Sequence, residues 1–407
     1  MATEIGCAKC GACAVVCPVF RVDGREVLTA RGKLHLLTIE LAEQPSAIFE
    51  DRFSHCLLCG ACEQTCPRQL SITELISQAR STFSRCYGPH GLKKAVVCTV
   101  LRHPELLEGV VKAGISLQRL QTLPAHSGLR LKLGILEEHP NSPSPSKTPQ
   151  QNDSINAPTA ALDYFTGCVA RHIQPSIARA TQSLLQHSGF STAHIPADQH
   201  CCGLAAWSAG RRDQARELAR KNIQAFSGAD GPIITSCASC SSHLLAYPTL
   251  FAEDDPWYDK ALAFAERVQE FTRFFDDKFP ELSQLEDSQH SEQRVFYHDP
   301  CHLRFQKKGM GSPRSLLQKI GMQIIEPEDG PRCCGQGGLF HIACPEYSAQ
   351  IFEKSSRQAL AESPDYITTT CSGCLIQFQE GLAKQGQQKV AVVHLALLLM
   401  NYQRKQS

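Results

Sequence analysis

The sequence predicts a mixed fold, with a helical, cysteine-rich N-terminal module followed by two copies of an α/β domain that each contain a parallel sheet. Three observations support this prediction. Two runs of four cysteines lie within the first 66 residues, a pattern of five cysteines occurs twice after residue 159, and strand-like and helix-like segments alternate around each five-cysteine pattern. These patterns contain 18 of the 21 cysteines, so most of the cysteines belong to regularly spaced motifs.

The patterns divide the 407 residues into five expected parts. These are an N-terminal module 1–85, a helical connecting region 86–138, a linker 139–158, a first repeat domain 159–285 and a second repeat domain 286–407. The linker is rich in Pro and Ser and has no aromatic residue, which predicts an extended chain. The connecting region is amphipathic at the helical period, so its helices either pack on the N-terminal module or form a docking surface for a membrane or a partner protein.

The charges are balanced, with 41 Lys and Arg against 40 Asp and Glu, so we expect no nucleic acid as a partner. The first residues lack the basic and apolar segments of a signal peptide, and the apolar run 390–400 is too short to span a bilayer. We therefore expect a cytoplasmic protein and leave open a peripheral position on the inner face of the cytoplasmic membrane. In that reducing compartment, many cysteines indicate metal binding rather than disulfides.

Helices are expected between and after the two four-cysteine runs. Residues 31–43 have apolar side chains at helical spacing. Residues 71–80 begin with Ser71, and Glu74 follows three residues later, which is the pattern of a capping box at a helix start. The cysteine runs would then lie in loops at helix ends.

The two repeat domains are predicted to be an internal duplication, because their matching cysteines are separated by 132 to 134 residues. The expected strands and helices are 161–166, 175–187, 192–196, 211–226 and 232–236 in the first copy, and 294–298, 313–320, 323–326, 347–360 and 366–370 in the second. This alternation predicts a parallel sheet, in which ligands bind at the carboxyl ends of the strands. The cysteine groups of both copies fall at those ends.

The four-cysteine runs have the spacing C-x2-C-x2-C-x3-C-P, which is typical of ligands of [4Fe–4S] clusters. Three thiolates in a tight loop surround one face of a cluster, and the fourth typically reaches the other cluster of a pair. Zinc is the alternative, but it favours two separated pairs of ligands. The predicted ligands of the first cluster are Cys7, Cys10, Cys13 and Cys66, and those of the second are Cys56, Cys59, Cys62 and Cys17.

The five cysteines of each repeat predict one further iron–sulfur cluster per copy. The predicted ligands are Cys168, Cys201, Cys202, Cys237 and Cys240 in the first copy and Cys301, Cys333, Cys334, Cys371 and Cys374 in the second. Five thiolates exceed the four that a cubane needs, so both a cubane and a noncubane form stay open. A redox-active dithiol or a zinc site is the alternative, because C-x2-C occurs in both.

Several residues near or outside these patterns have two interpretations. Cys86, Cys98 and Cys344 stand outside the patterns and are expected to pack in a core. His200 and His302 adjoin predicted ligands, and each is either a hydrogen-bond donor to cluster sulfur or a solvated or structural residue. Three arginines either offset the charge of thiolate-ligated clusters or are ordinary surface charges: Arg171, Arg304 and Arg332.

Two ferredoxin-type motifs followed by two Cys-Cys-Gly domains resemble the iron–sulfur subunits of glycolate oxidase and of related D-lactate dehydrogenases. The resemblance covers nearly the whole chain and includes the segment Ala30-Arg31-Gly32-Lys33 between the two motifs. The chain is also similar to one subunit of anaerobic glycerol-3-phosphate dehydrogenase and to the cluster subunit of heterodisulfide reductase.

The resemblance implies an electron-transfer subunit of an oxidoreductase complex. In this family a separate FAD-binding subunit oxidises a 2-hydroxy acid, and the iron–sulfur subunit passes the electrons to quinone or another acceptor. The sequence contains no G-x-G-x-x-G after a strand and no P-loop, so we expect no flavin and no catalytic residue in this chain. Both repeats keep all five cysteines, which is closer to heterodisulfide reductase and its noncubane cluster. The alternative function is therefore a catalytic subunit that reduces a disulfide.

Overall fold

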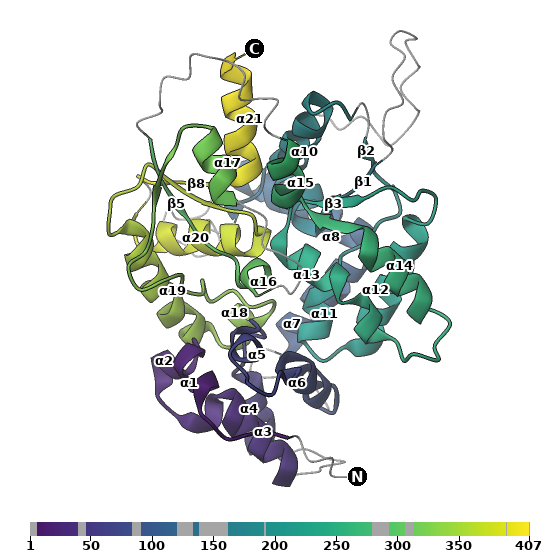
Figure 1. Cartoon of the computed structure of the whole chain (residues 1–407), viewed down its shortest axis with the longest axis vertical. Coiled ribbons are helices and arrows are strands. Elements are labelled where there is room, and N and C mark those ends of the chain that lie inside the picture. The colour runs from purple at the N-terminus through teal and green to yellow at the C-terminus, as the bar shows by residue number, and fades with distance from the viewer. Residues whose placement is uncertain are drawn as a thin grey trace.

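The computed structural model describes residues 6–39, 46–83, 91–119, 133–137, 162–190, 193–278, 293–305, 313–387 and 389–406. The predicted linker 139–158 and Cys86 lie outside these residues. Figure 1 shows the N-terminal helices at one end of the molecule and two α/β units side by side above them.

The N-terminal module consists of short helices joined by loops, and most of its cysteines lie in these loops. Its elements are α1 (Ala12–Val16), α2 (Phe20–Asp23), η1 (Glu26–Leu28), α3 (Ala30–Ile39), α4 (Ala47–Ser54), α5 (Ala61–Gln64) and α6 (Ile72–Ser81). The capping box predicted at Ser71 is wrong, although α6 does begin there, because the Ser71 side chain caps no backbone N–H. The carboxylate of Glu63 accepts instead from the Thr73 backbone N–H at 2.6 Å. The Glu74 carboxylate forms an ion pair with Arg212.

The connecting region forms α7 (Gly91–Arg102) and α8 (Pro104–Arg119), as its amphipathic pattern predicts. Helix α7 packs on α18 (Phe340–Ala343), and Cys98 joins the core of the N-terminal module. Other apolar side chains of the two helices stay exposed: Leu92, Val96, Leu106 and Val110. None of the described helices has the length and apolar character needed to cross a membrane.

Each copy of the repeat contains a four-stranded parallel sheet, which confirms the predicted fold class for this part of the chain. The first sheet has the order β2-β1-β3-β4, with β1 (Leu162–Phe165), β2 (Ala193–His194), β3 (Ile233–Thr235) and β4 (Val268–Glu270). The second has the order β6-β5-β7-β8, with β5 (Arg294–Tyr297), β6 (Gln323–Ile325), β7 (Tyr366–Thr369) and β8 (Ala391–His394). The two central strands of each sheet are largely buried, as expected for a parallel sheet covered by helices.

Helices cover both sheets. The first copy contributes η2 (Val169–Ile173), α10 (Pro175–His187), α11 (Leu204–Ser208), α12 (Arg212–Ala225), α13 (Ala238–Leu245), η3 (Tyr247–Leu250), α14 (Tyr258–Arg267) and α15 (Phe271–Lys278). The second contributes α16 (Cys301–Arg304), α17 (Pro313–Lys319), α18, α19 (Pro345–Leu360), α20 (Ser372–Lys384) and α21 (Leu395–Gln406). Helix α10 packs on α21 and α15 packs on α17, which are matching pairs from the two copies. The copies therefore meet through equivalent surfaces, with their central segments α13 and α20 in contact.

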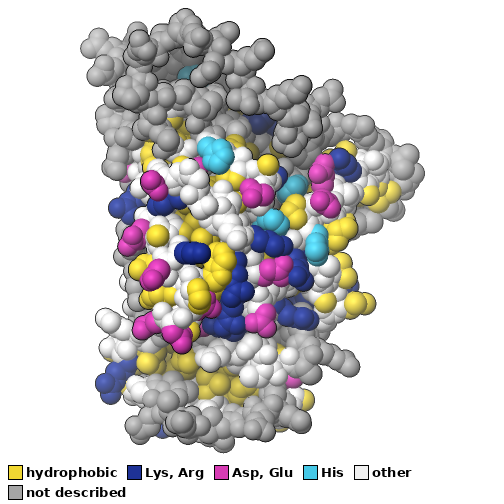
Figure 2. All heavy atoms as spheres, turned by 90° about the vertical axis from the view of Figure 1, so that its right-hand side faces the viewer, with side chains coloured by type: hydrophobic (Ala, Val, Ile, Leu, Met, Phe, Trp, Pro, Cys, Tyr) yellow, Lys and Arg dark blue, Asp and Glu magenta, His cyan; other side chains and the backbone are white. Residues whose placement is uncertain are grey.

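The face at the right of Figure 1 carries a mixture of charges. Figure 2 shows Lys and Arg side chains gathered there with Asp and Glu among them. The cations of α12 each have a carboxylate partner, as in the pairs Arg216–Asp213 and Lys221–Glu217. This face is therefore a set of local ion pairs.

The packing of α3 on η1 explains why glycine stands at position 32, in the segment between the two cysteine runs. A Cβ atom at Gly32 would lie 2.6 Å from both the Glu26 carbonyl oxygen and the Val27 Cα, so only glycine lets α3 lie this close to the backbone of η1. We expect Gly32→Ala to destabilise the N-terminal module by about 1–3 kcal/mol, because the obstructing atoms are backbone atoms that cannot rotate away.

Thermal unfolding followed by circular dichroism measures this effect. Gly109→Ala is the matched control, because Gly109 lies in α8 with open space around it, and alanine there should be neutral or stabilising. Equal unfolding temperatures for Gly32→Ala and the wild type would contradict the packing role.

Candidate metal centres

Four cysteines from the two ends of the N-terminal module line one cavity. They are Cys7, Cys10, Cys13 and Cys66. Cys7 and Cys10 come from the loop before α1, Cys13 comes from the first turn of α1, and Cys66 comes from the second cysteine run, much later in the chain. Arg31 also lines this cavity and donates from Nη1 to the Lys9 carbonyl at 2.8 Å, which ties α3 to the first cysteine loop.

The two cysteine loops have the same backbone conformation. Gly11 and Gly60 have φ of 83° and 80° and directly precede α1 and α5, and Lys9 and Leu58 both have φ of 53°. Left-handed conformations at alternate positions turn the chain sharply around a point. Helices α1 and α5 pack on each other, so the loops are held as a pair.

The second group of cysteines lies deeper in the molecule. Burial raises the pKa of Cys17, of Cys59 and of Cys62, and the nearby thiols reinforce this rise. Lys33 is only 1% exposed and donates from Nζ to the Leu28 carbonyl. Burial lowers the pKa of Lys33, whereas the nearby thiols of Cys56 and Cys17 act in the opposite direction. A cation therefore faces a group of thiols inside the protein.

Arg80 is the second buried cation beside this group. Its guanidinium donates at least five hydrogen bonds to four backbone carbonyls, at distances of 2.7 to 3.2 Å. Three of these carbonyls belong to Phe53, Ser54 and Cys56, and the fourth belongs to Ser208 of α11. Arg80 thus fixes the start of the second cysteine loop and joins it to the first repeat copy.

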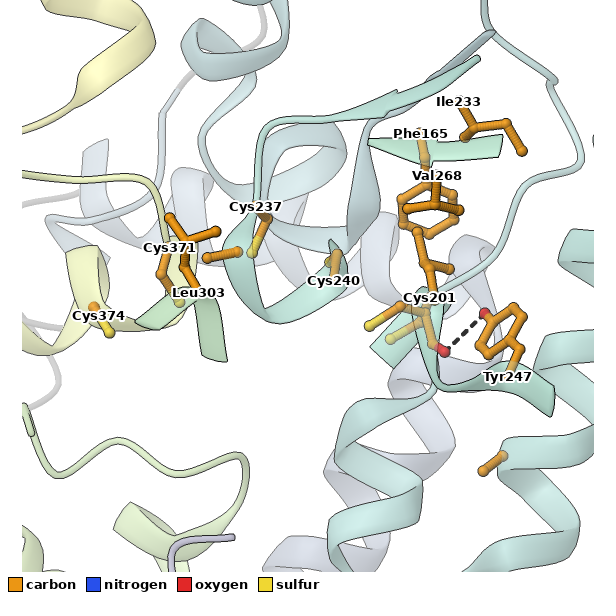
Figure 3. Packing of buried hydrophobic residues seen from close by; sticks show 14 of the residues in the cluster. Phe165, Cys201, Ile233, Cys237, Cys240, Tyr247, Val268, Leu303, Cys371 and Cys374 are labelled. Atoms are coloured by element: carbon orange, nitrogen blue, oxygen red, sulfur yellow. Dashed lines mark hydrogen bonds between the residues drawn. The ribbon is translucent and has the colours of Figure 1, made fainter. Parts of the chain in front are cut away.

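The ten cysteines of the repeats form one continuous row of side-chain contacts. In order they are Cys168, Cys201, Cys202, Cys240, Cys237, Cys371, Cys374, Cys334, Cys333 and Cys301. The Sγ atoms are 4.0 Å apart for Cys201 and Cys168 and 3.3 Å apart for Cys334 and Cys374. Figure 3 shows the central part of this row crossing from one copy to the other between Cys237 and Cys371.

The row has the same order of contacts on both sides of its centre. Hydrogen bonds from Cys168 and Cys202 lower the pKa of Cys201, and hydrogen bonds from Cys301 and Cys334 lower that of Cys333, the matching residue. Thiolates are the form of cysteine that binds metal. In both Cys-Cys-Gly loops, the neighbouring thiols therefore lower the pKa of the first cysteine, which is the direction that favours the metal-binding form.

The second copy also places a histidine among its thiols. His298 is buried, and its ligand nitrogen lies within 4.8 Å of the Cys334 and Cys374 sulfurs. Burial lowers the pKa of His298 to about 4. The matching position of the first copy holds Phe165, so the two sites differ in their surroundings.

Of the residues predicted near the cysteines, His302 approaches a thiol and His200 does not. His302 lies in hydrogen-bonding contact with Ser239, which in turn contacts Cys371. The His200 ring instead bonds the Asp198 carbonyl. Two of the predicted arginines tie loops together through backbone carbonyls: Arg171 through Gln199 and Ala197, and Arg304 through Pro331. Arg332 pairs with Asp329.

A cleft lies between the N-terminal module and the second repeat copy. Among the residues that the structure describes, three thiols line it, from Cys59, Cys301 and Cys333, and no carboxylate does. The described cations that line it are Arg21, Arg304, Arg332 and Lys354. The cleft therefore combines positive charge with access to thiols of two different groups.

The donor sets fit iron–sulfur clusters. Soft sulfur donors gather in groups of at least four, on tight loops, with buried cations nearby to balance negative charge. Cys98 and Cys344, which were expected to pack in a core, are indeed buried. Lys33, Arg80, Ser239 and His298 were not predicted. A residue-by-residue comparison of the two copies would have drawn attention to Ser239 and His298, because the other copy has a different residue at each position.

Comparison with known proteins agrees with this arrangement. Residues 5–70 match the 4Fe-4S dicluster domain, and residues 162–245 and 295–379 each match the Cysteine-rich domain. The probable glycolate oxidase iron–sulfur subunit of Bacillus subtilis is 29% identical over 97% of this chain and 93% of its own length. The glycolate oxidase iron–sulfur subunit of Escherichia coli is 22% identical over 94% of this chain and 91% of its own length.

A shorter relative matches as well. Lactate utilization protein A of an Exiguobacterium species is 29% identical over 60% of this chain and 97% of its own length. The chain therefore combines a 4Fe-4S dicluster domain with two cysteine-rich domains, and it resembles glycolate oxidase iron–sulfur subunits over nearly its whole length.

Proposed function

We propose that this chain is the electron-transfer subunit of a flavin-dependent 2-hydroxy-acid dehydrogenase, and that it passes electrons from a partner FAD subunit to quinone or another acceptor. The observation that carries this proposal is the succession of thiols that runs from the N-terminal module through the second repeat copy into the first. Cys59 of the N-terminal module and Cys333 of the second copy line the same cleft, and Cys333 contributes to the raised pKa of Cys59. The row of ten thiols continues from Cys333 into the first copy.

The proposed ligand sets follow this succession. One [4Fe–4S] cluster would be held by Cys7, Cys10, Cys13 and Cys66, a second by Cys17, Cys56, Cys59 and Cys62, and a further iron–sulfur cluster by the five cysteines of each repeat copy. Bound clusters supply one-electron redox chemistry, which can divide the two electrons of a reduced flavin into single transfers. Lys33 and Arg80 would offset the negative charge of the second set, and the short spacing between sets would keep successive carriers close.

The succession also gives an order. Within the succession of thiols, those of the second repeat copy come between Cys59 of the N-terminal module and Cys237 of the first copy. Electrons would thus pass through the second copy to reach the first. The burial of Cys202, Cys240, Cys334 and Cys374 favours such internal transfer over direct reaction with a substrate.

Reduction of a disulfide is the competing function, and the cationic cleft at Cys301 and Cys333 is the observation in its favour. An anionic disulfide could approach these thiols there. Protein supplied with an artificial electron donor should then consume a disulfide. Failure with a panel of small anionic disulfides would exclude this function.

Anaerobic purification of the full chain from cells that naturally make it tests the main proposal. We expect a flavoprotein to copurify, and we expect glycolate or D-lactate to bleach the visible absorbance of the complex. If dithionite bleaches the protein but no flavoprotein copurifies and no 2-hydroxy acid has an effect, the proposal is wrong.

A further inference from the structure

The C-x2-C loops of the two repeat copies differ at both residues between the cysteines. In the first copy this loop reads Cys237-Ala-Ser239-Cys240, and in the second it reads Cys371-Ser-Gly373-Cys374. Position by position, Ser239 matches Gly373. The first copy therefore offers a hydroxyl group where the second offers no side chain.

The hydroxyl of Ser239 reaches the other copy. Its Oγ lies 3.0 Å from the Cys371 sulfur and 2.8 Å from Nδ1 of His302; Cys371 is buried, and Ser239 and His302 are partly buried. The loop is held in this position by the backbone, because the Ala238 N–H, next to Ser239, donates to the Thr370 carbonyl at 2.9 Å. Ser239 is thus fixed between two residues of the second copy.

His302 has no counterpart in the first copy, where Val169 occupies the matching position. The His302 ring also lies against the backbone of Leu58 in the second N-terminal cysteine loop. The contact between Ser239 and His302 therefore sits where all three parts of the molecule meet.

We propose that Ser239 is a positioning residue of the second copy's cysteine site, and that its hydrogen bond to the Cys371 sulfur raises the reduction potential of that site. The inference rests on the proposed iron–sulfur function. A metal-bound Cys371 is a thiolate and can only accept, so the Ser239 O–H donates to it and the Nδ1–H of His302 donates to the Ser239 oxygen. Hydrogen bonds to ligand sulfur stabilise the added negative charge of the reduced state and are among the factors that set cluster potentials.

The two repeat sites are consequently unequal. The partner flavin would be the source of the electron that enters the second site, and the next cluster in the row would accept it. The Ser239 hydroxyl keeps its proton during both transfers. Since the thiols of the second site come between Cys59 and the thiols of the first copy, its potential would control passage along this row in either direction.

The test is a redox titration of the anaerobically purified full chain, followed by electron paramagnetic resonance. We expect Ser239→Ala to lower the potential of one repeat site by the equivalent of a tenfold change in its equilibrium constant, which is about 59 mV for a one-electron couple, with iron content unchanged. Ser239→Thr keeps the hydroxyl and should restore the wild-type potential. Ser241→Ala removes a buried hydroxyl from the same helix and should leave the second site unaffected.

Two results would overturn the inference, and they differ in what else they imply. An unchanged potential in Ser239→Ala, with both repeat sites loaded, would refute the role of Ser239 and leave the proposed function intact. A wild-type protein with no iron bound in the second copy would refute both.

Discussion

A Cys66→Ala variant is expected to lose about four iron atoms per chain, because alanine cannot replace the proposed fourth ligand of a [4Fe–4S] cluster. We expect this loss of iron although Cys66 is distant in sequence from the other three proposed ligands. In the structure this thiol lines the same cavity as Cys7, Cys10 and Cys13, although it belongs to the second cysteine run. Iron and sulfide analysis after anaerobic purification measures the loss.

A double variant distinguishes this shared site from two local ones. If Cys7 and Cys66 bind the same cluster, Cys7→Ala combined with Cys66→Ala should lose no more iron than either single variant. If each run binds its own cluster, the double variant should lose about eight iron atoms, and the proposed exchange of ligands would be wrong. Cys344→Ala is the control, because Cys344 is buried at 3.8 Å from the Ser54 carbonyl and outside the proposed ligand sets.

Substitution of Arg80 should have the largest effect on stability. Arg80→Ala removes at least five hydrogen bonds and leaves buried carbonyls of Phe53, Ser54 and Cys56 without this partner. Each buried acceptor that loses its donor costs about 1–3 kcal/mol of stability. We therefore expect the free energy of unfolding to fall by more than about 3 kcal/mol and the thermal midpoint to fall by roughly 5 °C or more.

Two further variants define this prediction. Arg80→Lys should recover little of the stability, because a single ammonium group cannot reach carbonyls arranged around a planar guanidinium. Arg357→Ala removes an exposed arginine that pairs with Glu353 on α19, and it should change the midpoint very little. If Arg80→Ala unfolds at the same temperature as Arg357→Ala, the role assigned to Arg80 is wrong.

The elements that the sequence predicted well carry strong local signals. Helix α10 spans Pro175–His187 as expected, with proline at its start and Gly189 after its end. Strands β5 and β7 are short apolar segments next to the cysteines, and their predicted ends were one residue too long. The sequence pattern alone was enough to predict these three elements, because local conformational preference and tertiary packing favour the same secondary structure there.

The elements that were missed lack such signals. Strand β4 has the sequence VQE, with a polar residue at its centre. Strand β8 runs into α21 without a break at Leu395, so the apolar segment 390–400 did not separate into two elements. Both are edge strands of their sheets, and pairing with β3 and β7 defines them more than their own composition does.

The candidate site was predictable as a set of cysteines, and its surroundings were not. Metal-ligand spacing is a local property of the chain, whereas the burial of Lys33 and Arg80 depends on how distant segments pack. A lysine and an arginine in amphipathic helices would ordinarily face solvent. Their positions beside thiols emerge only when the helices, the second cysteine loop and α11 come together.

The contact between Cys237 and Cys371 has a consequence for the history of the chain. These are matching residues, so the copies touch as the two halves of a symmetric homodimer would. In a homodimer of one such domain, any change at the position of Ser239 would appear at both sites at once. A single chain that contains both copies has no such restriction, and it can encode serine on one side and glycine on the other.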